Sequence, residues 1–70
     1  MRLTAVLMPD PDGGYVALNP ETGTASQGET VEEALANLQE ATELYLCEFP
    51  LSKSSAPLVT TFDVADHASA

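Results

Sequence analysis

The chain has 70 residues, 44% of them hydrophobic, one cysteine and a formal net charge of -9. This length allows one small domain, and the hydrophobic fraction predicts a folded chain rather than a disordered acidic tail. Eleven acidic residues against two basic ones repel phosphate backbones and anionic membranes, which argues against direct binding to nucleic acid. The longest apolar run, at residues 5–8, is far below the roughly 20 residues of a membrane span, so we expect a cytoplasmic protein.

Three short β-strands are predicted in the first part of the chain. Residues 2–8 are rich in Leu and Val, and residues 15–18 are again β-favouring. Between them lies a turn of alternating proline, aspartate and glycine at residues 9–14. A second turn at residues 21–24 precedes a short polar strand at residues 25–27. Such short connections predict an antiparallel meander.

A single helix follows the three strands. Thr30 and Glu33 match a capping box, in which the Thr30 hydroxyl accepts from the Glu33 N–H and the Glu33 carboxylate reaches back to the Thr30 N–H. The helix is expected to run to about Glu48, before Pro50. Its predicted core-facing stripe comprises Val31, Leu35, Leu38, Thr42, Tyr45 and Phe49, flanked by Ala34, Ala41 and Leu44.

Residues 58–64 alternate in a way that predicts a fourth strand. A right-handed crossover through the helix would place this strand parallel to the first, in the order 3-2-1-4. The expected fold class is therefore α+β, with a β-β-β-α-β order and one helix packed on the sheet. Residues 1–65 form the expected single domain, and residues 66–70 are expected to fray.

One helix covers only one face of a sheet, yet these strands carry apolar residues on both faces. An uncovered face of this composition usually marks an interface. We therefore expect a homodimer or a higher homo-oligomer. The residues expected at this interface are Val6, Met8, Val59 and Thr61.

Acidic residues gather on and beside the helix, with no Lys or Arg four positions on to offset them. One interpretation is a solvated outer face that keeps a small protein soluble. The other is a docking surface for a strongly basic protein, whose association such charge would accelerate. The candidate partner-binding residues are Glu29, Glu32, Glu33, Glu40 and Glu43.

Catalytic and metal-binding patterns are weak in this sequence. The segment from Asp10 to Glu21 superficially resembles a calcium loop, but its sixth position is Tyr15 instead of glycine. A metal nuclease of ribonuclease-H type would need Asp10, Asp12 or Asp63 to converge on Mg²⁺. His67 falls in the expected tail, and Cys47 is expected to be a buried or half-buried small hydrophobe. We therefore expect no catalytic residues, metal or cofactor.

Three linked motifs resemble the HicB-like antitoxin family over roughly residues 1–50. They are Asp12-Gly13-Gly14-Tyr15-Val16-Ala17, then Asn19-Pro20-Glu21, and then the stretch from Ser26 to Leu46 with Gly28-Glu29-Thr30 and Glu32-Glu33-Ala34-Leu35. The resemblance implies a partial ribonuclease-H-like fold without nuclease residues. It also implies that the protein binds and blocks HicA, a small basic toxin that cleaves mRNA.

Two departures from the family pattern bear on this expectation. Many relatives carry Leu-Pro-Gly-Cys where this chain has Thr22-Gly23-Thr24-Ala25, which affects partner choice. Fuller members also carry a C-terminal DNA-binding domain, so we expect a stand-alone form that does not repress its own operon. The alternatives are an orphan homo-oligomer with another partner and a metal-dependent, ribonuclease-H-like RNA-processing enzyme.

Overall fold

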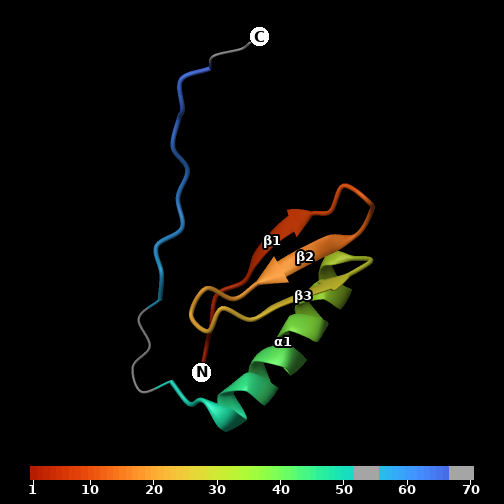
Figure 1. Ribbon diagram of the computed structural model, residues 1–70, viewed down its shortest axis with the longest axis vertical. Coiled ribbons are helices and arrows are strands. Elements are labelled where there is room, and N and C mark those ends of the chain that lie inside the picture. The colour runs from red at the N-terminus through yellow and green to blue at the C-terminus, as the bar shows by residue number, and fades with distance from the viewer. Residues whose placement is uncertain (52–55, 67–70) are drawn as a thin grey trace.

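The computed structural model describes residues 1–51 and 56–66. Within them it contains the strands β1 (Val6–Pro9), β2 (Tyr15–Leu18) and β3 (Ala25–Gly28) and the helix α1 (Val31–Glu48). The strands form an antiparallel sheet in the order β1-β2-β3, and α1 packs against one face of it (Figure 1). The predicted three-strand meander and the single covering helix are confirmed.

The turn between β1 and β2 depends on two glycines. Gly13 and Gly14 have φ values of 106° and 79°, which L side chains rarely adopt. The Gly13 N–H donates to the Asp10 carbonyl and the Asp10 N–H to the Gly14 carbonyl, both at 2.9 Å. The Asp10 carboxylate also accepts from the Asp12 N–H at 2.9 Å. The turn therefore sets the register in which Pro9 lies opposite Tyr15.

The helix begins with half of the predicted capping box. The Thr30 hydroxyl accepts from the Glu33 N–H at 3.1 Å, as expected. The Glu33 carboxylate, however, accepts from the N–H of Glu29 rather than from that of Thr30. Glu33 thus fixes the residue before the cap, at the point where the chain leaves β3. At the other end, the Phe49 N–H donates to the Tyr45 carbonyl at 2.8 Å.

The core lies between β2, β3 and α1 and consists mainly of small side chains. Ala17, Ala34 and Leu38 are buried, with Ala5, Leu7 and Tyr15 packed around them. Gly28 permits this close packing, because a Cβ on it would lie 2.5 Å from the Ala34 backbone nitrogen. The core-facing line of α1 is therefore Ala34, Leu38 and Thr42.

The predicted helix stripe was partly wrong. Val31, Leu35, Leu44 and Phe49 are exposed, Leu35 to the extent of 39% of its surface. The physical reason is that three short strands cover only a narrow band of α1, which lies close to β3 through Gly28. Large apolar residues on either side of that band therefore stay at the surface.

The predicted fourth strand beside β1 is not formed in the structure. Residues 56–66, which we call the arm, are exposed throughout and lead away from the sheet (Figure 1). A strand needs a partner for its backbone groups, and alternation alone does not supply one. Of the predicted tail at residues 66–70, only Asp66 lies within the described residues.

Candidate protein-binding site

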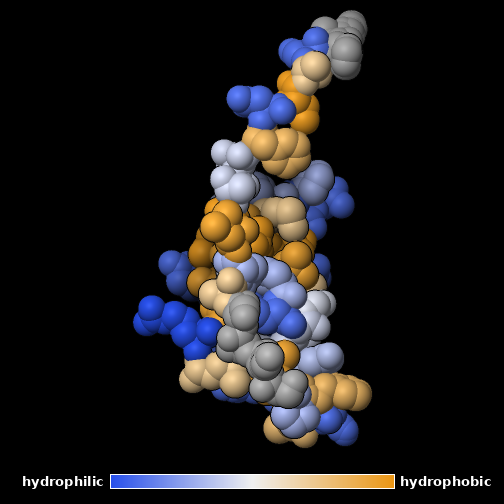
Figure 2. Space-filling model, turned by 90° about the vertical axis from the view of Figure 1, so that its left-hand side faces the viewer, coloured by the Kyte–Doolittle hydropathy of each residue, from blue (hydrophilic) through white to orange (hydrophobic). Residues whose placement is uncertain are grey.

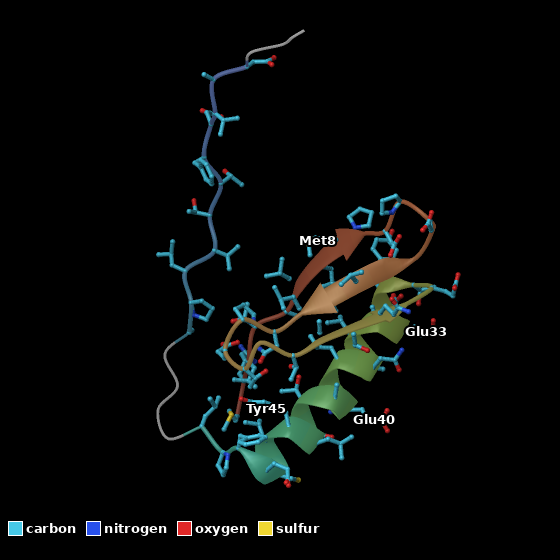
Figure 3. All side chains as sticks on the ribbon, viewed as in Figure 1. Met8, Glu33, Glu40 and Tyr45 are labelled. Carbon is cyan, nitrogen blue, oxygen red and sulfur yellow. The ribbon has the colours of Figure 1, made fainter. Side chains whose placement is uncertain are left out.

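The outer surface of α1 is acidic. Glu32, Glu33, Glu40 and Glu43 are all exposed. At about 100° of rotation per residue, they occupy an arc of about 100° on the side of the helix opposite Ala34 and Leu38. Figure 3 shows Glu40 projecting from the outer side of α1 and Glu33 at the start of the helix, near the end of β3. We call these residues, together with the exposed Glu29, the acidic face.

At the N-terminal end of α1 the acidic face continues into a hollow of about 410 Å³, which we call the acidic hollow. Its carboxylates come from two parts of the chain: Asp10 and Asp12 from the β1–β2 turn, and Glu29 and Glu33 from the start of the helix. Gln27, Gly28, Gly13, Tyr15 and Asn37 complete the lining.

Sequence reasoning missed the role of Asp10 and Asp12 in this surface. The pairing of β2 with β3 brings them there, because Tyr15 lies opposite Gly28 and so places the β1–β2 turn beside the β3–α1 connection. The two glycines at these sites are close, since a Cβ on Gly14 would lie 2.6 Å from the Gly28 carbonyl oxygen. A register assigned from the alternation of β2 and β3 could have revealed this.

Asn37, an exposed residue of α1 beside the acidic face, connects the helix to the sheet. The Asn37 side chain donates from Nδ2 to the Gln27 carbonyl oxygen at 2.8 Å, which ties the exposed side of α1 to β3. The sequence contains no Lys or Arg between Arg2 and Lys53, so no cation from this stretch neutralises the carboxylates. Such a surface attracts ammonium and guanidinium groups.

The structure does not assemble the alternative nuclease site. Among residues 1–51 and 56–66, no group of three or more His, Cys, Asp or Glu side chains is placed to hold a metal ion. Asp63 lies in the exposed arm, whereas Asp10 and Asp12 lie in the β1–β2 turn. His67 falls outside the described residues.

The expectation that Cys47 is buried or half-buried was wrong, since its side chain is exposed. Cys47 follows Glu40 by seven residues and Glu43 by four, which places all three on the outward side of α1. The thiol therefore lies beside the acidic face rather than in the core.

The expected oligomer-interface residues fall in two separate places. Val6 and Met8 lie on the sheet face away from α1, and 46% of the surface of Met8 is exposed. The same face carries Val16 and Leu18 of β2. Val59 and Thr61 lie in the arm, and the structure does not bring them to the sheet.

A polar network holds residues 1–5, which we call the N-terminal segment, against the β2–β3 turn. Asn19, only 1% exposed, donates from Nδ2 to the Thr4 carbonyl at 2.7 Å and to Glu21 Oε1 at 2.6 Å. Its Oδ1 accepts from the Thr22 N–H at 3.0 Å. Further along, the hydroxyls of Thr24 and Thr42 are 2.8 Å apart and connect the turn to α1. This network supports the fold and is separate from the acidic face.

Within the network, Glu21 is held in its charged form. Partial burial raises the pKa of Glu21, but hydrogen bonds from the Thr4 N–H and hydroxyl and from the Asn19 amide together lower this pKa below its ordinary value. Glu21 is therefore a structural carboxylate and is not available as a proton donor near neutral pH.

Comparison with known proteins gives a family and two curated relatives. Residues 5–54 match a family described as "Family of unknown function (DUF7387)". The chain is 50% identical over 44 residues to "UPF0150 protein ssr1765" of Synechocystis sp. (strain ATCC 27184 / PCC 6803 / Kazusa), covering 61% of this chain and 56% of that protein. It is 49% identical over 47 residues to "UPF0150 protein" of Helicobacter pylori (strain J99 / ATCC 700824), covering 66% and 64% of the two.

The chain thus spans less than two thirds of the length of either curated relative. No solved structure matches it. In the part of the chain that the structure describes, no helix combines the length and the apolar character that crossing a bilayer requires.

Proposed function

We propose that this chain, which belongs to the family of unknown function DUF7387, is a HicB-like antitoxin module that neutralises a small basic HicA-like toxin. The observation that carries the proposal is the gathering of carboxylates from the β1–β2 turn and from α1 on one continuous surface. RNA-binding faces are rich in Lys and Arg because they neutralise phosphates. An acidic inhibitor can therefore cover such a face by charge complementarity.

The two parts of this surface would act differently. Glu40 and Glu43 are exposed rim charges, which mainly accelerate association and contribute about 0–1 kcal/mol per ion pair. The acidic hollow can receive a Lys or Arg side chain between the carboxylates of Asp12, Glu29 and Glu33. The module is a non-enzyme that needs no metal or cofactor, and it works in the cytoplasm, where the mRNA target of the toxin is found.

The finer fold is also part of the proposal. In a partial ribonuclease-H-like arrangement, residues 58–64 occupy the position beside β1, in the strand order 3-2-1-4. Val59 and Thr61 then join Val6 and Met8 on the sheet face that α1 leaves open, and this face mediates homo-oligomerisation. The support is the apolar character of that face and of the arm.

The proposal is tested by co-expressing this chain with a HicA-like toxin from the same genome and measuring growth and copurification. The wild-type chain should restore growth and copurify with the toxin, whereas Glu29→Lys combined with Glu33→Lys should do neither. The matched control is Glu48→Lys combined with Asp66→Lys, which changes the net charge equally outside the acidic face. If both double variants protected cells equally, the acidic face would not be the binding site.

A further inference from the structure

An apolar groove of about 520 Å³ runs along the free edge of the sheet, between the N-terminal segment and α1. Its apolar lining consists of Met1, Leu3 and Ala5 on one side and Leu35, Leu38 and Leu46 on the other. Leu35 is one of the large side chains that the three-stranded sheet leaves exposed. At this groove the three strands leave apolar side chains of α1 uncovered, and a fourth strand beside β1 would cover them.

The backbone of β1 along this groove is open to a further strand. The Asp10 N–H donates to the Gly14 carbonyl, so Asp10, Met8 and Val6 direct their backbone groups toward β2. By the same alternation, the peptide groups of Leu7 and Ala5 point outward, away from β2. Pro9 also lies on this outward set, which fits an edge strand because it has no N–H to donate.

The arm carries exposed apolar side chains that match the apolar lining of the groove. Its large apolar side chains are almost fully exposed, with 87% for Leu58, 84% for Phe62 and 76% for Val64. These three residues share one face of an extended chain. Figure 2 views the molecule from the side of the arm and shows hydrophobic side chains gathered in the middle of that face.

The arm lies apart from its own sheet, and a proline stands at each end of the connection that leads to it (Figure 1). Pro50 follows the helix cap and Pro57 precedes Leu58, and each disfavours the helical conformation for the residue before it. Phe49, before Pro50, has φ -131° and ψ 77°. In the structure the arm does not fill the groove of its own chain, which leaves that groove open to the arm of a second copy. Exchange of an identical element between two copies is a low-cost route to a dimer.

We propose that residues 58–64 pair with β1 of a second copy and fill its groove, so that two chains exchange arms in a closed, two-fold symmetric homodimer. Each groove receives Leu58, Phe62 and Val64 of the other chain, and each free β1 edge gains a parallel strand. The inference rests on the proposed position of the arm beside β1, but it does not depend on toxin binding.

Isotope-filtered NMR on the unmodified chain tests this directly. A refolded equal mixture of ¹³C-labelled and unlabelled chains should show intermolecular contacts between the Phe62 ring and the methyl groups of Ala5 and Leu35. Contacts found only within one chain would overturn the exchange while leaving the fourth strand in place. If the Phe62 ring contacted neither its own groove nor that of another chain, both the exchange and the fourth strand would be wrong.

Sedimentation of the wild-type chain and isotope-filtered NMR of two variants provide further checks. The wild-type chain should sediment at twice its monomer mass or as an even multiple of it. Phe62→Asp should abolish the intermolecular contacts between Val64 and the groove methyl groups, since a carboxylate cannot be buried there without a partner. Asp66→Asn, just beyond the paired residues, is the control and should retain them. Retention of these contacts in Phe62→Asp would contradict the proposal.

Discussion

Glu21 and Thr4 form a two-point contact: the Thr4 N–H donates to Glu21 Oε1 and the Thr4 hydroxyl to Glu21 Oε2, each at 3.0 Å. These bonds join the N-terminal segment to the β2–β3 turn, 17 residues later in the chain. They replace the strand ladder that residues 2–5 do not form, which explains why β1 begins at Val6 rather than at residue 2.

Replacing Glu21 by Gln should lower the melting temperature at pH 7, because one of the two acceptor oxygens becomes an amide that faces a donor. The folded-state pKa of Glu21 is lowered, so its stabilising contribution is present above about pH 4.5 and is lost as the pH falls through the folded-state pKa. The difference in melting temperature between the two proteins should therefore shrink below about pH 4.5. A difference that is the same at pH 7 and pH 3 would contradict this role.

Asn19→Ala should lower the free energy of unfolding by about 1–3 kcal/mol, because the Thr4 carbonyl and the Thr22 N–H lose buried partners. Urea denaturation of the two proteins measures this loss. Gln39→Ala, at an exposed position of α1, is the control and should change the value by less than about 0.5 kcal/mol. If both variants lost a comparable free energy of unfolding, the Asn19 hydrogen bonds would stabilise the fold no more than an exposed side chain does.

Gly28→Ala tests the close approach of β3 to α1. A methyl group there would lie 2.5 Å from the Ala34 nitrogen, so the helix must shift, at a cost of about 1–3 kcal/mol. Gln27→Ala is the matched control, because Asn37 uses the carbonyl of Gln27 and not its side chain. Chemical denaturation of both variants should show a loss for Gly28→Ala only, and an unchanged midpoint for this variant would contradict the packing described.

Thr30→Ala should destabilise the protein by about 0.5–2 kcal/mol, because the hydroxyl that accepts from the Glu33 N–H is lost. Thr30→Ser keeps an acceptor at this position and should behave nearly as the wild type. Thermal unfolding followed by circular dichroism measures both. If Thr30→Ser lost as much stability as Thr30→Ala, the cap would not be the cause.

Short sequence motifs correctly predicted those parts of the fold that depend only on residues close together in the chain. The glycines of the β1–β2 turn and the Thr30 cap each determine the conformation of a few neighbouring residues, and both features are confirmed. The helix stripe was harder, because hydrophobicity favours Leu35 and Phe49 whereas the closeness of Gly28 to Ala34 favours small side chains. The distance between Gly28 and Ala34 is set by the packing of α1 on β3, and the hydrophobic periodicity of α1 carries no information about it.

The sequence predicted the negative charge of the candidate site but not all of the residues that form it. The glutamates of α1 were visible as a charge pattern, and they lie on one outward arc as the helical period requires. Asp10 and Asp12 join them only through the pairing of β2 with β3. The buried Asn19 was also missed, because its sequence surroundings are those of an ordinary exposed turn.

The most direct test of the account is the rate of association with a HicA-like toxin as a function of ionic strength. Glu40→Lys combined with Glu43→Lys should slow association at low salt by about 10-fold or more and flatten the salt dependence, because rim charges act mainly on the encounter rate. Both side chains are exposed, so the melting temperature should change little. Equal association rates for the wild type and this variant at low salt would contradict a docking role for the acidic face.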